Sequence, residues 1–79
     1  MWNVYIIKST NNNYRYIGST NDLNRRIAEH NKGLCPATKS YKPFKIIACI
    51  AVKDKDTAVK LERYLKTGSG IAFVNKRLL

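Results

Sequence analysis

The sequence predicts a small α+β domain built on a three-stranded, mainly antiparallel sheet flanked by helices. Two observations favour this class. Residues 2–8 and 14–18 alternate as strands do, and helical periodicity then appears twice, over residues 22–31 and again up to Lys66. A third β-rich run, residues 44–52, separates the two helical segments. The predicted order is β-β-α-β-α with a last short helix, in one domain over residues 1–79.

The first two strands are predicted to form a hairpin. Thr10-Asn11-Asn12-Asn13 contains residues that tolerate tight turns, and the extended pattern resumes after it. Alternation places side chains on two faces. One face of the first strand carries Trp2, Val4 and Ile6, the opposite face carries Asn3, Tyr5 and Ile7, and one face of the second strand carries Tyr14, Tyr16 and Gly18.

The first helix is predicted over residues 22–31, with Thr20 or Asn21 as its cap and Asn31-Lys32-Gly33 as its end. Residues 33–43 contain Gly and Pro and predict an exposed loop. The run 44–52 is almost continuously apolar, which predicts a central strand covered on both faces, with Cys49 as a small buried residue.

The second helix is expected to begin at a cap formed by Asp56 or Thr57 and to reach about Lys66. The Gly68-Ser69-Gly70 segment predicts a turn, and a last short helix is expected from Ala72.

The charge of the chain indicates a polyanionic partner. Fifteen Lys and Arg residues against five Asp and Glu residues leave a net charge of +10, spread along the sequence. Nucleic acid is the commonest partner of such a surface, and a solvated basic surface is the alternative. An anionic membrane is less favoured, because no basic helix carries a broad apolar face. Two cysteines and no apolar run of membrane length lead us to expect a reduced, cytoplasmic protein.

The first predicted helix carries two candidate site residues. Arg26 and His30 are four apart, so they share one helical face beside the apolar stripe of Leu23 and Ile27. Arg25 and Glu29 are expected to point further outward. An arginine there suits bidentate phosphate contact, while the alternative is a structural Arg26 and a satisfied interfacial His30.

The second predicted helix carries an acid on its apolar stripe. Glu62 falls on the same stripe as Ala58, Leu61 and Leu65. An inward carboxylate is costly unless it is paired or binds a cation, so a divalent metal ion and a pair with Arg26 or another base both remain open. The hydroxyls of Tyr5 and Tyr16 could accept a proton or donate a hydrogen bond, although tyrosines also pack in strands.

Taken together, the residues resemble the GIY-YIG nuclease family, in its small single-domain branch. Asn3-Val4-Tyr5 stands where the family has Gly-Ile-Tyr, and Tyr16-Ile17-Gly18 matches the second motif in full. The run STNDLNRRIAEH resembles the family's helix and AVKLERYLK resembles its glutamate helix. The loop TKSYKPF and the ending SGIAF are also similar, so the resemblance covers nearly the whole chain.

The resemblance implies a divalent-metal-dependent endonuclease that acts on DNA, with branched or damaged structures in repair or recombination as an expected substrate class. It implies five catalytic residues, Tyr5, Tyr16, Arg26, His30 and Glu62, with Glu62 holding one Mg²⁺ or Mn²⁺ ion. His30 is expected to hydrogen-bond a tyrosine. Phosphate contacts are expected from Lys39, Lys42 and Lys45, and Asn75 is a further candidate.

Two alternatives to a self-sufficient nuclease stay open. One is a nucleic-acid-binding module that keeps the fold without useful catalysis, and the other is a subunit that needs a protein partner or a second copy for activity. The sequence does not separate DNA from RNA as the partner. The set of five residues favours catalysis, because binding alone does not require an inward Glu62.

Overall fold

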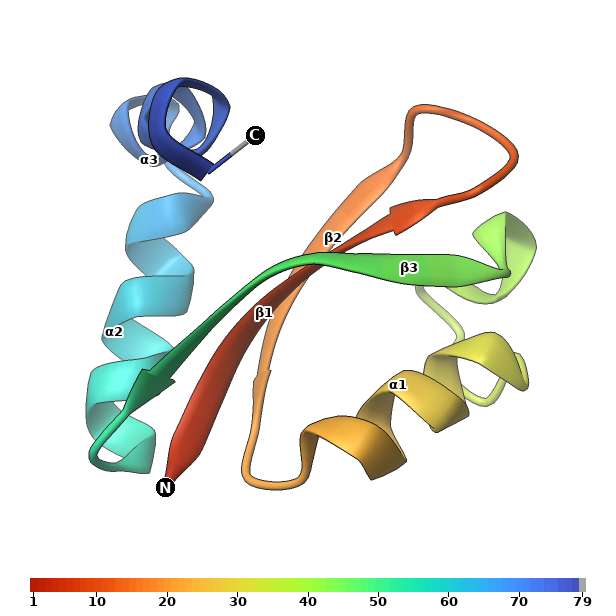
Figure 1. Ribbon diagram of the computed structural model, residues 1–79, viewed down its shortest axis with the longest axis horizontal. Coiled ribbons are helices and arrows are strands. Elements are labelled where there is room, and N and C mark those ends of the chain that lie inside the picture. The colour runs from red at the N-terminus through yellow and green to blue at the C-terminus, as the bar shows by residue number, and fades with distance from the viewer. Residues whose placement is uncertain (79) are drawn as a thin grey trace.

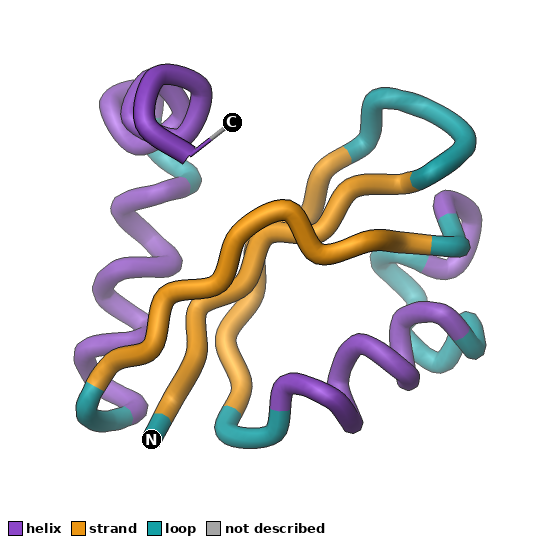
Figure 2. The backbone as a smooth tube through the Cα atoms, viewed as in Figure 1, coloured by secondary structure: helices purple, strands orange, loops and turns teal. Residues whose placement is uncertain are grey.

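The computed structural model describes residues 1–78 and contains one open sheet with helices on both faces (Figures 1 and 2). The strand order is β2-β1-β3, and both pairings are antiparallel. The predicted α+β class and element order are confirmed. The elements are β1 (Trp2–Ser9), β2 (Arg15–Thr20), α1 (Leu23–Asn31), η1 (Lys39–Tyr41), β3 (Phe44–Val52), α2 (Lys55–Leu65), α3 (Gly68–Phe73) and η2 (Val74–Leu78), the last a π-helical segment.

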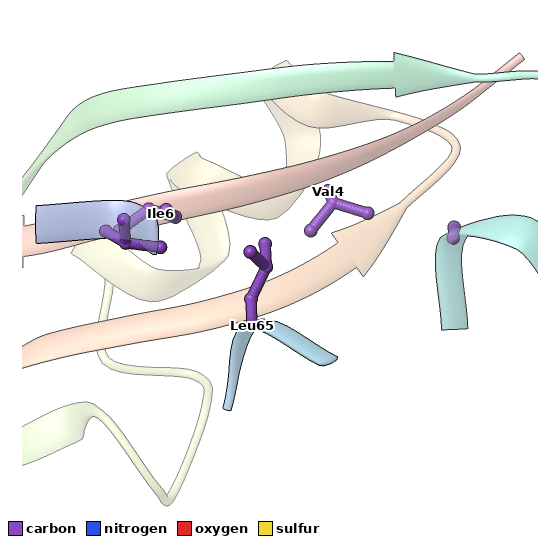
Figure 3. Close-up of a cluster of buried hydrophobic side chains, with 5 residues drawn as sticks. Val4, Ile6 and Leu65 are labelled. Atoms are coloured by element: carbon purple, nitrogen blue, oxygen red, sulfur yellow. The ribbon is translucent and has the colours of Figure 1, made fainter. Parts of the chain in front are cut away.

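The alternation of β1 divides the core into two halves, as predicted. Val4 and Ile6 pack with Leu65 of α2 on one face of the sheet (Figure 3). Tyr5 and Ile7 form the other half, against the face that α1 covers. Figure 1 shows the sheet lying between α2 and α1. The two helices therefore position side chains on opposite faces of the same three strands.

The prediction that residues 44–52 form the central strand is wrong. The central strand is β1, whose residues Val4–Ile7 are all buried, whereas β3 lies at an edge and, after the buried Phe44, has only half-buried and exposed positions. Cys49, predicted to be buried, is exposed. Apolar composition does not identify the neighbours of a strand, and the alanines and cysteine of β3 are small enough to lie at a partly covered edge.

The helix boundaries agree with the sequence more closely than the capping residues do. Asp22 caps α1 by accepting the Arg25 N–H, in place of Thr20 or Asn21. Asp54 caps α2 through the Thr57 N–H, in place of Asp56 or Thr57. The end of α1 is as predicted, since Gly33 adopts a φ of 78°, which favours glycine.

Two connecting segments differ from their predictions. Residues 68–70 are not a turn, because they form the first half of α3, which Thr67 caps. The segment 33–43 is only partly exposed, because two of its own residues, Cys35 and Thr38, are buried. Asn31 anchors the end of this segment, since its side-chain oxygen accepts the Phe44 N–H at 2.6 Å.

The helices of residues 1–78 are all too short or too polar to cross a lipid bilayer.

Candidate active site

A buried chain of hydrogen bonds links β1, α1 and the segment after α1. The Tyr5 hydroxyl lies 2.9 Å from His30 Nε2, and His30 Nδ1 lies 2.8 Å from Thr38 Oγ1. Tyr5 is 1% exposed, and His30 and Thr38 are fully buried. The expected contact between His30 and a tyrosine is therefore present, and the tyrosine is Tyr5.

The contacts of Thr38 let us assign the tautomer of His30. The Thr38 hydroxyl donates to the Cys35 carbonyl at 3.4 Å, so its oxygen is free to accept the Nδ1–H of His30. Nε2 then carries no hydrogen and accepts the Tyr5 O–H. Burial lowers the pKa of His30, and the Arg26 charge lowers it further. His30 is therefore a neutral acceptor at pH 7.

Arg26 lies beside the Tyr5–His30–Thr38 hydrogen-bond network, and its side chain is one-third exposed. One guanidinium nitrogen donates to Glu29 Oε1 at 3.0 Å, and the other lies 3.8 Å from Cys35 Sγ. Glu29 is therefore half-buried, not turned outward as expected. Burial raises the pKa of Tyr5 to about 12 against the opposing effect of Arg26. Tyr5 is accordingly un-ionised at neutral pH.

The glycine of the Tyr-Ile-Gly motif has a packing role. Gly18 pairs with Tyr5 across β1 and β2. A Cβ built on Gly18 would lie 2.6 Å from Tyr5 Cζ and would also meet the Tyr5 hydroxyl. Only a residue without a Cβ leaves room for the Tyr5 ring at this position. Gly18 therefore allows the Tyr5 hydroxyl to reach His30.

Tyr16 is the more accessible tyrosine. It is half-buried, and its ring centroid lies 5.1 Å from that of His30 and 6.4 Å from that of Tyr5. The Lys66 ammonium lies 5.7 Å from the centroid of the Tyr16 ring, within cation–π range. A cavity of about 560 Å³ opens beside Tyr16 and Lys66, lined mainly by apolar side chains.

Glu62 lies at the free edge of β2 and does not join the hydrogen-bonded chain. Its Oε1 accepts the Ser19 hydroxyl at 2.8 Å, and its Oε2 accepts the Lys66 ammonium at 2.8 Å. The base that pairs with Glu62 is therefore Lys66, not Arg26. Because Lys66 also covers the Tyr16 ring, it connects Glu62 to the tyrosine side of the site.

The remaining candidates are dispersed. Lys39 and Lys42 are exposed after α1, where their side chains lie over Gly33. Lys45 lies elsewhere and lines a cavity at the start of β3. Asn75 is exposed in η2 and makes no hydrogen bond to the other candidates within residues 1–78. Tyr5, Tyr16, Arg26 and His30 are thus brought together, while Glu62 is adjacent.

Sequence reasoning missed three polar contacts at the site, made by Thr38, Ser19 and Lys66. Thr38 lies in a segment whose composition resembles an exposed loop, so no pattern marks it. Ser19 follows the Tyr-Ile-Gly motif directly, and Lys66 is four residues after Glu62, a spacing at which helical side chains meet. That spacing could have identified the Glu62–Lys66 pair.

A metal ion would find one carboxylate at this site. Within residues 1–78, His, Cys, Asp and Glu side chains nowhere gather in threes as a dense metal site requires. Mg²⁺ and Mn²⁺ accept hard oxygen ligands, and Mg²⁺ is commonly held by one or two carboxylates with waters and substrate phosphates. Glu62, with the Ser19 hydroxyl beside it, fits an ion of that kind.

The chain belongs to the GIY-YIG family. The family model described as the GIY-YIG catalytic domain matches residues 1–71. This is a family of nuclease domains that generally depend on divalent metal ions, so membership implies nuclease-type activity in general and suggests DNA as the substrate.

Curated proteins similar to this chain include small bacterial proteins named UPF0213. One from Listeria welshimeri is 40% identical over 63 residues, which cover 78% of this chain and 69% of that protein. One from Cupriavidus pinatubonensis is 32% identical over 79 residues, covering 95% and 87%. The solution NMR structure of a UPF0213 protein from Bacillus halodurans has a TM-score of 0.58 at 28% identity, covering 99% of this chain and 87% of that one.

Proposed function

We propose that the protein is a divalent-metal-dependent endonuclease that hydrolyses phosphodiester bonds in DNA, with residues 1–79 acting as one catalytic domain. The observation that carries the proposal is the buried Tyr5–His30–Thr38 chain with Arg26 beside it. A surface that only binds nucleic acid does not need a fully buried, neutral histidine to orient a tyrosine. A role in repair or recombination within the cytoplasm belongs to the same proposal.

Each residue has a role that its surroundings support. Arg26 is cationic and one-third exposed, so its guanidinium can neutralise charge that develops on the phosphate oxygens. Tyr16 is the tyrosine that a water molecule can reach, and its hydroxyl would position the attacking water. Tyr5 and His30 act through Arg26 and Tyr16, because both are buried. Cleavage then forms a bond from the water oxygen to phosphorus and breaks the bond to the leaving oxygen; the attacking water gives its proton to solvent water, and the leaving oxygen takes a proton from solvent water.

Glu62 would hold the Mg²⁺ or Mn²⁺ ion. When bound, the ion would supply a Lewis acid for the scissile phosphate. Lys66 would have to release Oε2 of Glu62, while Ser19 can keep its hydrogen bond to Oε1. The released Lys66 ammonium, which lies near the Tyr16 ring, can then donate a hydrogen bond to a phosphate oxygen.

A nuclease assay on plasmid, single-stranded and branched DNA with Mg²⁺ or Mn²⁺ tests the proposal. We expect Arg26→Ala and Glu62→Gln to lower kcat by a factor of about 100 or more, as loss of a transition-state contact does. Arg25→Ala is the matched control, because Arg25 is the exposed neighbour of Arg26. Cleavage that survives both substitutions would refute the mechanism.

The Glu62–Lys66 pair also supports a second candidate, a nucleic-acid-binding module without catalysis. In that case Lys66 permanently neutralises Glu62, and no metal ion is needed. Binding of DNA or RNA without cleavage in either metal would favour this candidate over the nuclease.

A further inference from the structure

Three cations lie in register across the sheet at the end near the β1–β2 turn. Lys8 of β1 pairs with Arg15 of β2 on one side and with Lys45 of β3 on the other. Residues directly opposite on neighbouring strands share a face, with Cβ atoms about 4.5–5.5 Å apart. Arg15, Lys8 and Lys45 therefore form one line across all three strands, which we call the basic row.

The basic row has no neutralising partner within residues 1–78. The three ion pairs there join Arg25, Arg26 and Lys66 to three of the five acids. The other two acids lie at the start of α2, beyond the opposite end of the sheet. That end is about 20 Å away, because β1 rises about 3.4 Å per residue. Like charges directly opposite on neighbouring strands destabilise a sheet. The basic row therefore lowers the stability of the folded protein.

The basic row also lines a hollow that leads to the candidate active site. Lys8, Arg15 and Lys45 line a cavity of about 410 Å³ together with Asn13 and Ile47. Asn13 and Arg15 line the neighbouring cavity of about 560 Å³ as well. That second cavity reaches Tyr16 and Lys66. Asn13 and Arg15 therefore lie between the cavity beside Tyr16 and the cavity of the basic row, and they line both.

We propose that the basic row is a phosphate-binding site for the backbone of a nucleic acid, which holds the substrate beyond the cleaved bond. The nucleic acid would run around the free edge of β2, from Tyr16 to the sheet face opposite Tyr5. The identity of this ligand rests on the proposed function. Backbone phosphates fit the row because they are spaced anions, and a row of cations neutralises several at once.

The test is binding of a fluorescein-labelled DNA duplex and of its single strand, measured by anisotropy in EDTA over a range of salt concentrations. The variant Lys8→Gln/Arg15→Gln/Lys45→Gln removes the basic row. The matched control, Lys53→Gln/Lys60→Gln/Lys76→Gln, removes the same charge from exposed positions elsewhere. Because EDTA prevents metal-dependent cleavage, the result does not depend on whether the protein is a nuclease.

We expect the row variant to bind duplex DNA about 30-fold or more weakly at low salt, with a salt slope reduced by about 2–3, since each lost phosphate contact removes about 0.9. The control should lose less than about threefold. Equal losses in the two variants would overturn the proposal. Unchanged DNA binding with lost binding to phosphatidylserine vesicles would assign the row to a membrane instead, and would also overturn it.

A second measurement separates binding from a structural role. Removing three like charges should raise the Tm of the row variant at low salt, and the gain should shrink as salt screens the repulsion. If the three side chains instead stabilised the fold by packing, the row variant would have a lower Tm than the wild type. A row variant that is less stable than the control at low salt would therefore contradict the proposal even if its DNA affinity falls.

Discussion

His30 shows how one residue can link the fold to the site. Its two ring nitrogens contact a strand residue and a loop residue, Tyr5 and Thr38, and its ring is fully buried. The contact with Tyr5 needs a neutral ring, because a charged ring has no acceptor for the Tyr5 O–H. The same neutrality that positions Tyr5 therefore makes the fold sensitive to pH.

We predict that the free energy of unfolding decreases as pH falls below about 6.5. The folded pKa of His30 is lowered, so the unfolded chain takes up this proton first and stability is lost between the unfolded and the folded pKa. His30 is the only histidine of the sequence. Urea unfolding at about pH 7.5 and pH 5.5 should thus show the loss in the wild type and not in His30→Gln. Equal stability of the wild type at both pH values would contradict the burial of a neutral ring.

The two tyrosines should respond differently to removal of their hydroxyls. Tyr5→Phe leaves His30 Nε2 buried without a donor, which should cost about 1–3 kcal/mol of stability as well as activity. Tyr16→Phe should lower kcat and leave stability within about 0.5 kcal/mol, since the half-buried ring is kept. Thermal unfolding and steady-state cleavage measure both. A Tyr16→Phe enzyme with normal kcat would move the water-positioning role to Tyr5.

At the scale of elements, the two glycines of α3 allow a controlled comparison, because a Cβ would clash at one and fit at the other. A Cβ on Gly70 would lie 2.5 Å from Leu65 Cα, within the backbone of α2, whereas a Cβ on Gly68 would meet nothing. Gly70→Ala must push α3 away from α2 and should cost about 3 kcal/mol or more. Gly68→Ala should be neutral or stabilise by up to about 1 kcal/mol. Chemical denaturation compares the two; similar effects would mean that α3 does not pack this closely.

The sequence predicts individual strands and helices here better than it predicts which of them pair or pack together. The alternation of β1 correctly divides the core, because a side chain's face depends only on its own strand. Because β1 and β2 pair with each other as a hairpin, β3 lies at an edge of the three-stranded sheet whichever of them it joins, and its apolar composition does not show this. For the same reason the spacing of Arg26 and His30 indicates one helical face, but not that Thr38 lies beneath it or that Lys66 reaches Glu62.

In the whole molecule, the residues proposed to act in cleavage lie on both faces of the sheet, some on the face that α1 covers (the α1 layer) and some on the face that α2 covers (the α2 layer). The α1 layer holds the buried chain and Arg26, while the α2 layer holds Glu62, and β2 lies between them with Tyr16 on one face and Ser19 on the other. A ligand that engages both layers must cross the free edge of β2. Binding there should stabilise the fold as a unit, because it joins helices that pack on opposite faces of the sheet.

A divalent ion at Glu62 should therefore raise the Tm of the whole protein. At a tenfold excess over its Kd, an ion that binds only the folded state adds about 1.4 kcal/mol, or about 6–11 °C for a domain of this size. Differential scanning fluorimetry with Mn²⁺ should show the rise in the wild type and in Glu29→Gln, whose carboxylate belongs to the α1 layer. It should be absent in Glu62→Gln. The same rise in all three proteins would place the ion away from Glu62, and the Lys66 ammonium would then remain the only cation that Glu62 needs.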